Sequence, residues 1–206
     1  MLFPSFCCGC KTLGPYLCER CYEKLQFYPL PISIDTLRLE TVYLDQLIAA
    51  VEYEPTIGSL LHYLKYKHAR EIGEYCGDLL YFSTFFPMTD FITATPLHPS
   101  RRSDRGYNQS EVIAQRLAKY THVPYRIFLR RTKVTASQAS LKEREKRLSN
   151  LANIFAFSHN PELIINKRIL LIDDVCTTGT TLNECARILK KAGAKQVVGL
   201  VVAHGQ

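Results

Sequence analysis

The amino-acid sequence has no hydrophobic run long enough to form a membrane-spanning helix. Its longest apolar stretches are residues 197–203 and the polar-interrupted residues 79–86, whereas such a helix needs about 20 consecutive apolar residues. The segment Met1-Leu2-Phe3-Pro4 also lacks the basic and apolar regions of an export signal. We therefore expect a cytoplasmic protein with no membrane span and with reduced cysteine thiols.

Acidic residues are scarce in one part of the chain. The 206 residues are 47% hydrophobic and contain 26 Lys and Arg against 19 Asp and Glu, a formal net charge of +7. This composition supports one full-sized core with a small appendage and excludes a disordered tail. Residues 98–149 hold 13 of the basic and 4 of the acidic residues, a local charge of +9, so the rest of the chain is slightly acidic. A concentrated basic region favours a site for phosphate or nucleic acid.

The chain has no internal repeat or low-complexity tract, and its composition divides it into three parts. Residues 1–26 are rich in Cys and turn residues, the proline-containing residues 27–36 indicate an extended linker, and residues 37–206 alternate strand and helix patterns. The predicted strands cover residues 47–53, 91–95, 125–129, 169–172 and 197–202, and the predicted helices begin at Pro55 or cover residues 70–83, 109–120 and 182–192. The alternation predicts an α/β fold with a doubly wound, mostly parallel sheet.

The most informative segment joins the buried strand 169–172 to a helix. Two carboxylates, Asp173 and Asp174, are followed by the turn residues Thr177, Thr178, Gly179, Thr180 and Thr181. Ligands of open α/β sheets bind at this end of a strand, and the N–H groups of a helix N-terminus suit a phosphate. Two carboxylates suit ribose hydroxyls and a nearby Mg²⁺. The alternative is an ordinary helix cap, for which one Asp suffices.

A second segment, residues 98–109, follows the predicted strand that precedes Pro96. We interpret it as a loop in which Arg101, Arg102 and Arg105 present guanidinium groups to pyrophosphate oxygens. Gly106 would give this loop the freedom to close. The alternative is a solvated basic loop.

Four cysteines in the first 26 residues have the spacing of a metal site. Cys7-x₂-Cys10 and Cys18-x₂-Cys21 can present four thiolates to a structural Zn²⁺. Cys8 competes with Cys7 as a ligand, although the spacing from Cys8 to Cys10 is less favourable. The alternatives are a disulfide or free thiols. A closed site of four thiolates leaves no open coordination position, so we expect a scaffold rather than a catalytic metal.

The sequence Asp-Asp-Val-x-Thr-Thr-Gly-x-Thr at residues 173–181 resembles the phosphoribosyl pyrophosphate (PRPP) loop of type I phosphoribosyltransferases. The resemblance implies that Asp173 and Asp174 hold the ribose hydroxyls as the catalytic pair. It also implies two groups of phosphate ligands. The 5′-phosphate is assigned to Thr177, Thr178, Gly179, Thr180 and Thr181, and the pyrophosphate to Arg101, Arg102, Arg105 and Gly106.

The motifs together resemble the ComF family of competence proteins. They are the Cys-rich finger, Arg-Gly-Tyr-Asn-Gln at residues 105–109, a basic segment with Gln138, Arg147 and Asn150, and the PRPP loop. The resemblance implies a role in natural competence, in handling imported single-stranded DNA beside a helicase-like partner, with Zn²⁺ and Mg²⁺ as cofactors. It assigns residues 130–157 to a mobile loop over PRPP and places Lys65-Tyr66-Lys67 near the site rim. Glu143 and Arg147 leave open an ordinary charged helix over residues 141–148.

Two classes of function remain open at this point. Bound PRPP would lose pyrophosphate from ribose C1, with Mg²⁺ and arginines stabilising the leaving charge. No motif supplies a nucleobase pocket, so the acceptor is unidentified and a non-catalytic PRPP sensor is the other reading. A single-stranded DNA groove would use Arg101, Arg105, Arg130 and Arg131, with stacking on Tyr107, Tyr120, Tyr125 and Phe128, although core spacing explains these aromatics equally well.

Overall fold

The computed structural model describes residues 6–65, 69–132 and 154–205. Its helices are α1 (Glu19–Tyr22), η1 (Ile34–Leu37), α2 (Pro55–Leu64), α3 (Arg70–Ser83), α4 (Pro99–Arg105), α5 (Gln109–Thr121), η3 (Pro161–Leu163) and α7 (Thr180–Lys191). Its strands are β1 (Gln46–Glu52), β2 (Phe91–Ala94), β3 (Leu129–Arg131), β4 (Phe155–Phe157), β5 (Arg168–Cys176) and β6 (Gln196–His204).

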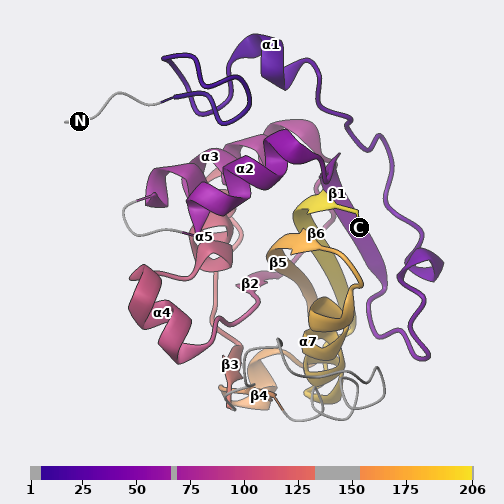
Figure 1. The fold of residues 1–206 in the computed structure, drawn as a ribbon. Helices are drawn as coiled ribbons and strands as arrows, with labels where there is room; N and C mark the ends of the chain where they lie inside the picture. The colour runs from indigo at the N-terminus through magenta and orange to yellow at the C-terminus, as the bar shows by residue number, and fades with distance from the viewer. Residues whose placement is uncertain (1–5, 66–68, 133–153, 206) are drawn as a thin grey trace, which may run out of the picture.

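The main sheet has four strands in the order β1-β6-β5-β2, and every adjacent pair is parallel (Figure 1). Side chains alternate between its two faces, so that Leu170 packs into one hydrophobic cluster and Leu171 into the other. Because both faces are covered, β5 and β6 are apolar along almost their whole length. The predicted mostly parallel sheet is confirmed.

Helices cover both faces of this sheet, as Figure 1 shows. One face packs against apolar side chains of α2, α3 and α5, such as Leu60, Leu80 and Ile113. The other face packs against α7 and the antiparallel pair β3–β4, which contribute Leu189 and Phe155. Among the described residues, no helix has both the length and the apolarity needed to cross a membrane.

The Cys-rich module lies over α2 and α3 at the top of Figure 1. Its buried side chains, among them Cys7, Leu17 and Leu25, belong to the same hydrophobic cluster as the α2–α3–α5 face. Tyr16 donates a hydrogen bond of 2.9 Å to Glu71 of α3, and Lys11 Nζ lies 5.3 Å from the ring centre of Tyr63. The module and the sheet domain therefore share one continuous core.

Residues 27–36, which we interpret as a linker, lie against the outer edge of β1. Phe27 forms an antiparallel bridge to Val51, and Ile32 forms one to Leu47. The segment is thus ordered by backbone hydrogen bonds. The domain boundaries assigned from composition stay predictions.

The structure differs from the expected loop at residues 98–109, where α4 forms instead. Pro99 stands in the first helical turn, where its fixed φ suits a helix. His98 caps the helix, because its Nδ1 accepts a hydrogen bond from the Ser100 N–H at 3.2 Å. Gly106 ends it with a φ of 82°. The glycine therefore terminates a helix, and the loop prediction was wrong because it gave no weight to the capping residues.

Candidate functional site

The acidic pair lies at the carboxyl end of the sheet, where β5 and β2 run side by side. Asp173 and Asp174 are near the end of β5, and Thr95 follows the end of β2 directly. The N-terminus of α5, with Asn108 and Ser110, closes the same corner. All five residues are buried.

A chain of hydrogen bonds positions Asp173. Ser110 Oγ donates to Asp173 Oδ1 at 2.9 Å, and Thr95 Oγ1 is 3.2 Å from Ser110 Oγ. Asn108 Nδ2 donates to the Thr95 carbonyl at 2.9 Å, while Asn108 Oδ1 accepts from the Ser110 N–H. Burial, and then the charge of Asp174, raise the pKa of Asp173 to about 7. The carboxyl group thus has one defined orientation in a site with little access to water.

Asp174 faces a cation. Lys65 Nζ, directly after α2, lies 3.3 Å from Asp174 Oδ2. That oxygen is buried and makes no hydrogen bond among the described residues. Hard cations such as Mg²⁺ take carboxylate oxygens of this kind, so the residues present fit a divalent cation. Such an ion would neutralise negative charge on phosphate oxygens bound beside the pair.

The turn after β5 has the conformation that the threonine-rich motif predicts. Gly179 has a φ of +73° and directly precedes α7, and a Cβ there would lie 2.7 Å from a methyl carbon of Leu37. No side chain caps α7 at Gly179. Thr177, Thr178 and Thr181 are exposed. Within the turn, the Thr180 N–H donates to Thr178 Oγ1 at 3.5 Å, and the hydroxyl oxygens of Thr178 and Thr180 are 2.8 Å apart. The exposed Thr177 and Thr181 hydroxyls lie beside this helix N-terminus, a position that suits an anion.

The predicted arginines differ in their surroundings. Arg102 is paired with Glu111 at 2.8 Å, whereas Arg105 Nη1 donates to Gln109 at 3.0 Å. Burial lowers the pKa of Arg105, the charge of Asp174 opposes this shift, and the charge of Arg101 adds to it. Burial and then Arg101 likewise lower the pKa of Arg131. The charge of Arg101 therefore acts on both Arg105 and Arg131, and the charge of Asp174 acts on Arg105.

Arg130 and the aromatic residues lie elsewhere. Because side chains alternate along a strand, Arg130 and Arg131 of β3 point to opposite faces. Tyr107 and Phe128 are buried in the two hydrophobic clusters, and Tyr120 stacks on Tyr81 with ring centres 4.6 Å apart. The core reading of these aromatics is thus favoured over base stacking.

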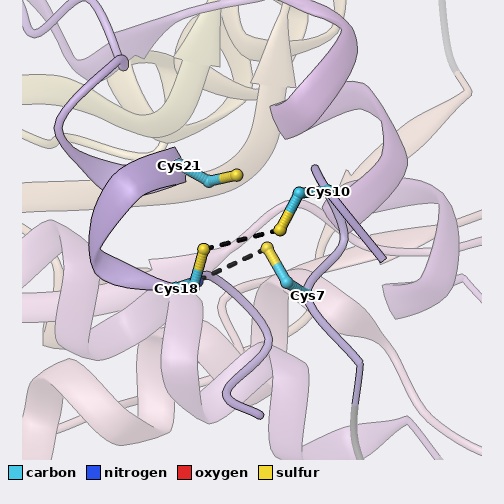
Figure 2. A group of neighbouring side chains, drawn as sticks. All are labelled: Cys7, Cys10, Cys18 and Cys21. Atoms are coloured by element: carbon cyan, nitrogen blue, oxygen red, sulfur yellow. Dashed lines mark hydrogen bonds between the residues drawn. The ribbon is translucent and has the colours of Figure 1, made fainter. Parts of the chain in front are cut away.

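The four predicted metal ligands converge, as Figure 2 shows. The sulfur atoms of Cys7, Cys10, Cys18 and Cys21 all lie within 4.8 Å of one another, and those of Cys10 and Cys18 are 3.6 Å apart. Tetrahedral Zn²⁺ binds thiolate sulfur at about 2.3 Å, so this group fits Zn²⁺. Hydrogen bonding from Thr12 lowers the pKa of the Cys10 thiol to about 5, which favours the metal-binding thiolate.

Cys8 stands outside this group. It is buried at 3% exposure, and desolvation raises the pKa of its thiol. The turn at residues 7–10 approaches Cys21 closely, and a glycine at position 9 makes this possible. A Cβ at that position would lie 2.8 Å from Cys21 Sγ. The convergence of the four sulfur atoms thus favours Cys7 over Cys8 as a metal ligand.

Several functional residues escaped sequence reasoning. Thr95 and Ser110 had no motif of their own. The pairing of β2 with β5 brings Thr95 to the site, and the packing of α5 against β5 brings Ser110 to Asp173. For Lys65, the family resemblance did predict a position near the rim of the site. Gln138, Glu143, Arg147 and Asn150, with the helix considered over residues 141–148, lie outside the described residues.

Comparison with known proteins gives the class first. Residues 107–206 match the family described as "Phosphoribosyl transferase domain". Two solved structures resemble the fold distantly. Glutamine PRPP amidotransferase from B. subtilis is 18% identical, with 67% of this chain and 30% of that chain covered and a TM-score of 0.46. Adenine phosphoribosyltransferase from Thermoanaerobacter pseudethanolicus is 13% identical, with 84% and 100% covered and a TM-score of 0.43. The chain is thus a phosphoribosyltransferase-type α/β protein with an N-terminal four-cysteine module.

Named relatives give the family. "Competence protein F" from Haemophilus influenzae is 28% identical over 204 residues, covering 94% of this chain and 87% of the relative. "DNA utilization protein YhgH" from Escherichia coli O157:H7 is 31% identical over 200 residues, covering 92% and 79%. "Competence protein ComFC" from Streptococcus pneumoniae is 38% identical over 102 residues, covering 50% and 42%. The chain belongs to the ComF family of competence proteins.

Proposed function

We propose that this protein binds PRPP or a related phosphoribosyl ligand with Mg²⁺, and that it acts in the cytoplasmic handling of imported single-stranded DNA. One observation carries the first part. The buried pair Asp173 and Asp174 stands near the carboxyl end of β5, and the threonine-rich turn connects it to the N-terminus of α7. This arrangement offers acceptors for hydroxyl groups beside donors for a phosphate.

Each group in the site has a distinct role in this proposal. Asp173, oriented by Ser110, and Asp174 accept hydrogen bonds from the ribose hydroxyls. The threonine turn around Gly179 binds the 5′-phosphate through N–H and hydroxyl donors. Arg101 and Arg105 face the pyrophosphate, whereas Arg102 is partly neutralised by Glu111. Mg²⁺ balances the remaining phosphate charge when bound.

PRPP bound in this way is compatible with two functions, a transfer reaction and a sensor. With an acceptor nucleophile, the bond between ribose C1 and the pyrophosphate oxygen breaks, the acceptor bonds to C1, and pyrophosphate leaves with the electron pair of that bond. Without an acceptor, the protein is a sensor that reports PRPP to a partner. A screen for pyrophosphate release with nucleobase-like acceptors separates a phosphoribosyltransferase from a sensor.

Calorimetry tests PRPP binding. PRPP with Mg²⁺ is titrated into the zinc-loaded wild type, into the double variant Asp173→Asn plus Asp174→Asn, and into the control Glu162→Gln. Glu162 is exposed in η3, which precedes the amino end of β5, so its removal changes charge away from the site. We expect saturable binding by the wild type and the control, and none by the double variant. A folded wild type that does not bind PRPP contradicts the proposal.

The DNA part rests on four arginines and on the names of the relatives. Arg101, whose charge acts on Arg105 and Arg131, would bind DNA phosphates together with them, and Arg130 is exposed on β3. The helicase-like partner remains a proposal from the family resemblance. Fluorescence anisotropy with labelled single-stranded DNA should show affinity that falls steeply with salt. Arg101→Ala and Arg105→Ala should each weaken it, and Lys191→Ala on α7 should not.

A further inference from the structure

A positively charged side chain from outside the two ligand-binding motifs lies beside the acidic pair. Lys65 Nζ is 3.3 Å from Asp174 Oδ2, and the Asp174 side chain is only 7% exposed. A buried carboxylate without a counter-charge is costly, so the ammonium stabilises the ligand-free site. The contact is to Asp174 Oδ2, a buried oxygen that makes no hydrogen bond among the described residues.

The backbone that carries Lys65 is anchored, whereas the ammonium is not. The Leu64 carbonyl accepts a hydrogen bond of 2.5 Å from Tyr107 OH, and the Lys65 N–H donates to the His62 carbonyl at 3.0 Å. The Lys65 side chain itself is 36% exposed. Its four-carbon stem lets Nζ move away from Asp174 while the backbone stays in place.

Arg105 is a second cation on which the charge of Asp174 acts. Its Nη1 is hydrogen-bonded to Gln109, which holds part of the guanidinium group on α5. A guanidinium is also a planar donor group rather than a compact ion. A small divalent cation that binds Asp174 Oδ2 would therefore displace the Lys65 ammonium.

We propose that Lys65 is an exchangeable counter-ion of Asp174, which neutralises this carboxylate in the ligand-free protein and competes with a divalent cation for it. The inference rests on the magnesium-dependent site proposed above. The Lys65 ammonium and a divalent cation cannot both occupy the position beside Asp174 Oδ2. A divalent cation without a bound phosphoribosyl ligand therefore binds weakly. By linkage, each cation weakens the other by the same factor.

The test uses Mn²⁺ alone as the probe, titrated into zinc-loaded protein and followed by electron paramagnetic resonance. Lys65→Met should bind Mn²⁺ roughly three- to ten-fold more tightly than the wild type, because the competing charge is gone. Lys191→Met, which removes the same charge from an exposed position on α7, should leave the affinity unchanged. The gain should disappear when Lys65→Met is combined with Asp174→Asn, and Lys65→Arg should stay close to the wild type.

A second readout follows the ammonium itself. Reductive methylation with ¹³C-formaldehyde labels the lysines, and the Lys65 signal is identified by its loss in Lys65→Met. Both Mg²⁺ and the Asp174→Asn substitution should move this signal toward the position of a solvated lysine. A residue that only supported the fold would not respond to the ion in this way.

Two results overturn the inference. One is an unchanged or weaker Mn²⁺ affinity in a folded Lys65→Met variant, and the other is a Lys65 signal that ignores Mg²⁺. These outcomes are separable from failure of the proposed function. PRPP binding by the wild type without a gain for Lys65→Met removes the counter-ion inference alone, whereas a gain without PRPP binding removes the proposed ligand and leaves Lys65 in place.

Discussion

At the scale of single residues, Gly179 links the phosphate turn to a distant part of the chain. Its φ of +73° is costly for any residue with a Cβ, and the Leu37 side chain occupies the space that this Cβ would need. Gly106 provides a comparison, because its φ is +82° and nothing lies within 4 Å of a Cβ built there. The two glycines thus share a conformational requirement and differ in their surroundings.

We predict that Gly179→Ala destabilises the fold more than Gly106→Ala does. The backbone penalty of about 1–2 kcal/mol applies to both substitutions, whereas only Gly179→Ala also displaces Leu37. Urea unfolding of the two variants beside the wild type measures the difference. Equal losses would show that Leu37 moves aside at no cost. PRPP binding should fall in Gly179→Ala, because the turn that presents the N–H groups is distorted.

The threonine-rich motif predicted the turn at Gly179, because the requirement for a positive φ is local. The contact with Leu37 was beyond sequence reasoning, since 142 positions separate the two residues and no periodicity relates them. Cys8 illustrates the same limit. Its spacing left it in competition with Cys7, and only the path of the backbone separates a metal ligand from a core residue.

At the scale of elements, one ion pair joins β2 to the start of β5. Asp90 accepts hydrogen bonds from the Arg168 N–H at 2.8 Å, from Nε at 3.1 Å and from Nη2 at 2.9 Å. These hydrogen bonds from Arg168 lower the pKa of Asp90 to about 2. The pair stands at the amino end of the strands whose carboxyl ends form the site, so it keeps Thr95 in register with Asp173.

We predict that Asp90→Asn lowers the free energy of unfolding at pH 7 by about 1 kcal/mol, because both side chains are partly exposed. The folded-state pKa is depressed, so the stabilisation by Asp90 is complete above its ordinary value of 3.8 and declines as the pH falls toward 2. The difference between variant and wild type should therefore be constant from pH 7 to about pH 5 and shrink below it. Urea titrations across this range measure it, with Glu162→Gln as a control. A difference that persists at pH 2 contradicts the assignment.

Most elements of the sheet domain follow from hydrophobic periodicity. The predicted helix over residues 70–83 is α3, and the apolar run at residues 169–172 lies inside β5. The segment 125–129 was harder, because β3 begins only at Leu129 while Tyr125 forms a single bridge to Ile92. Short strands carry too few residues for a period to be recognised.

At the scale of the whole molecule, the four-cysteine module is part of the main core. Leu17 and Leu25 pack in the cluster formed by α2, α3 and α5. A metal that orders the module should therefore stabilise the whole molecule, because the apolar surface it covers is shared.

We predict one cooperative thermal transition that moves to lower temperature when zinc is removed by a chelator. An independent finger would instead give an unchanged main transition. Differential scanning calorimetry distinguishes the two. Cys10→Ser should reduce the bound zinc measured by mass spectrometry, and Cys8→Ser should retain about one zinc per chain. Equal zinc loss in both variants would contradict the assignment of Cys7 over Cys8.

The sequence by itself determined most strands and helices of the main sheet, the four-cysteine spacing, the acidic pair and the phosphate turn, because each of these depends on neighbouring residues along the chain. The tertiary structure decided which distant side chains meet. Ser110 reaches Asp173, Lys65 reaches Asp174, and Leu37 covers Gly179. These contacts depend on strand order and helix packing, which minimise exposed apolar surface over the whole molecule and leave no mark in a local pattern.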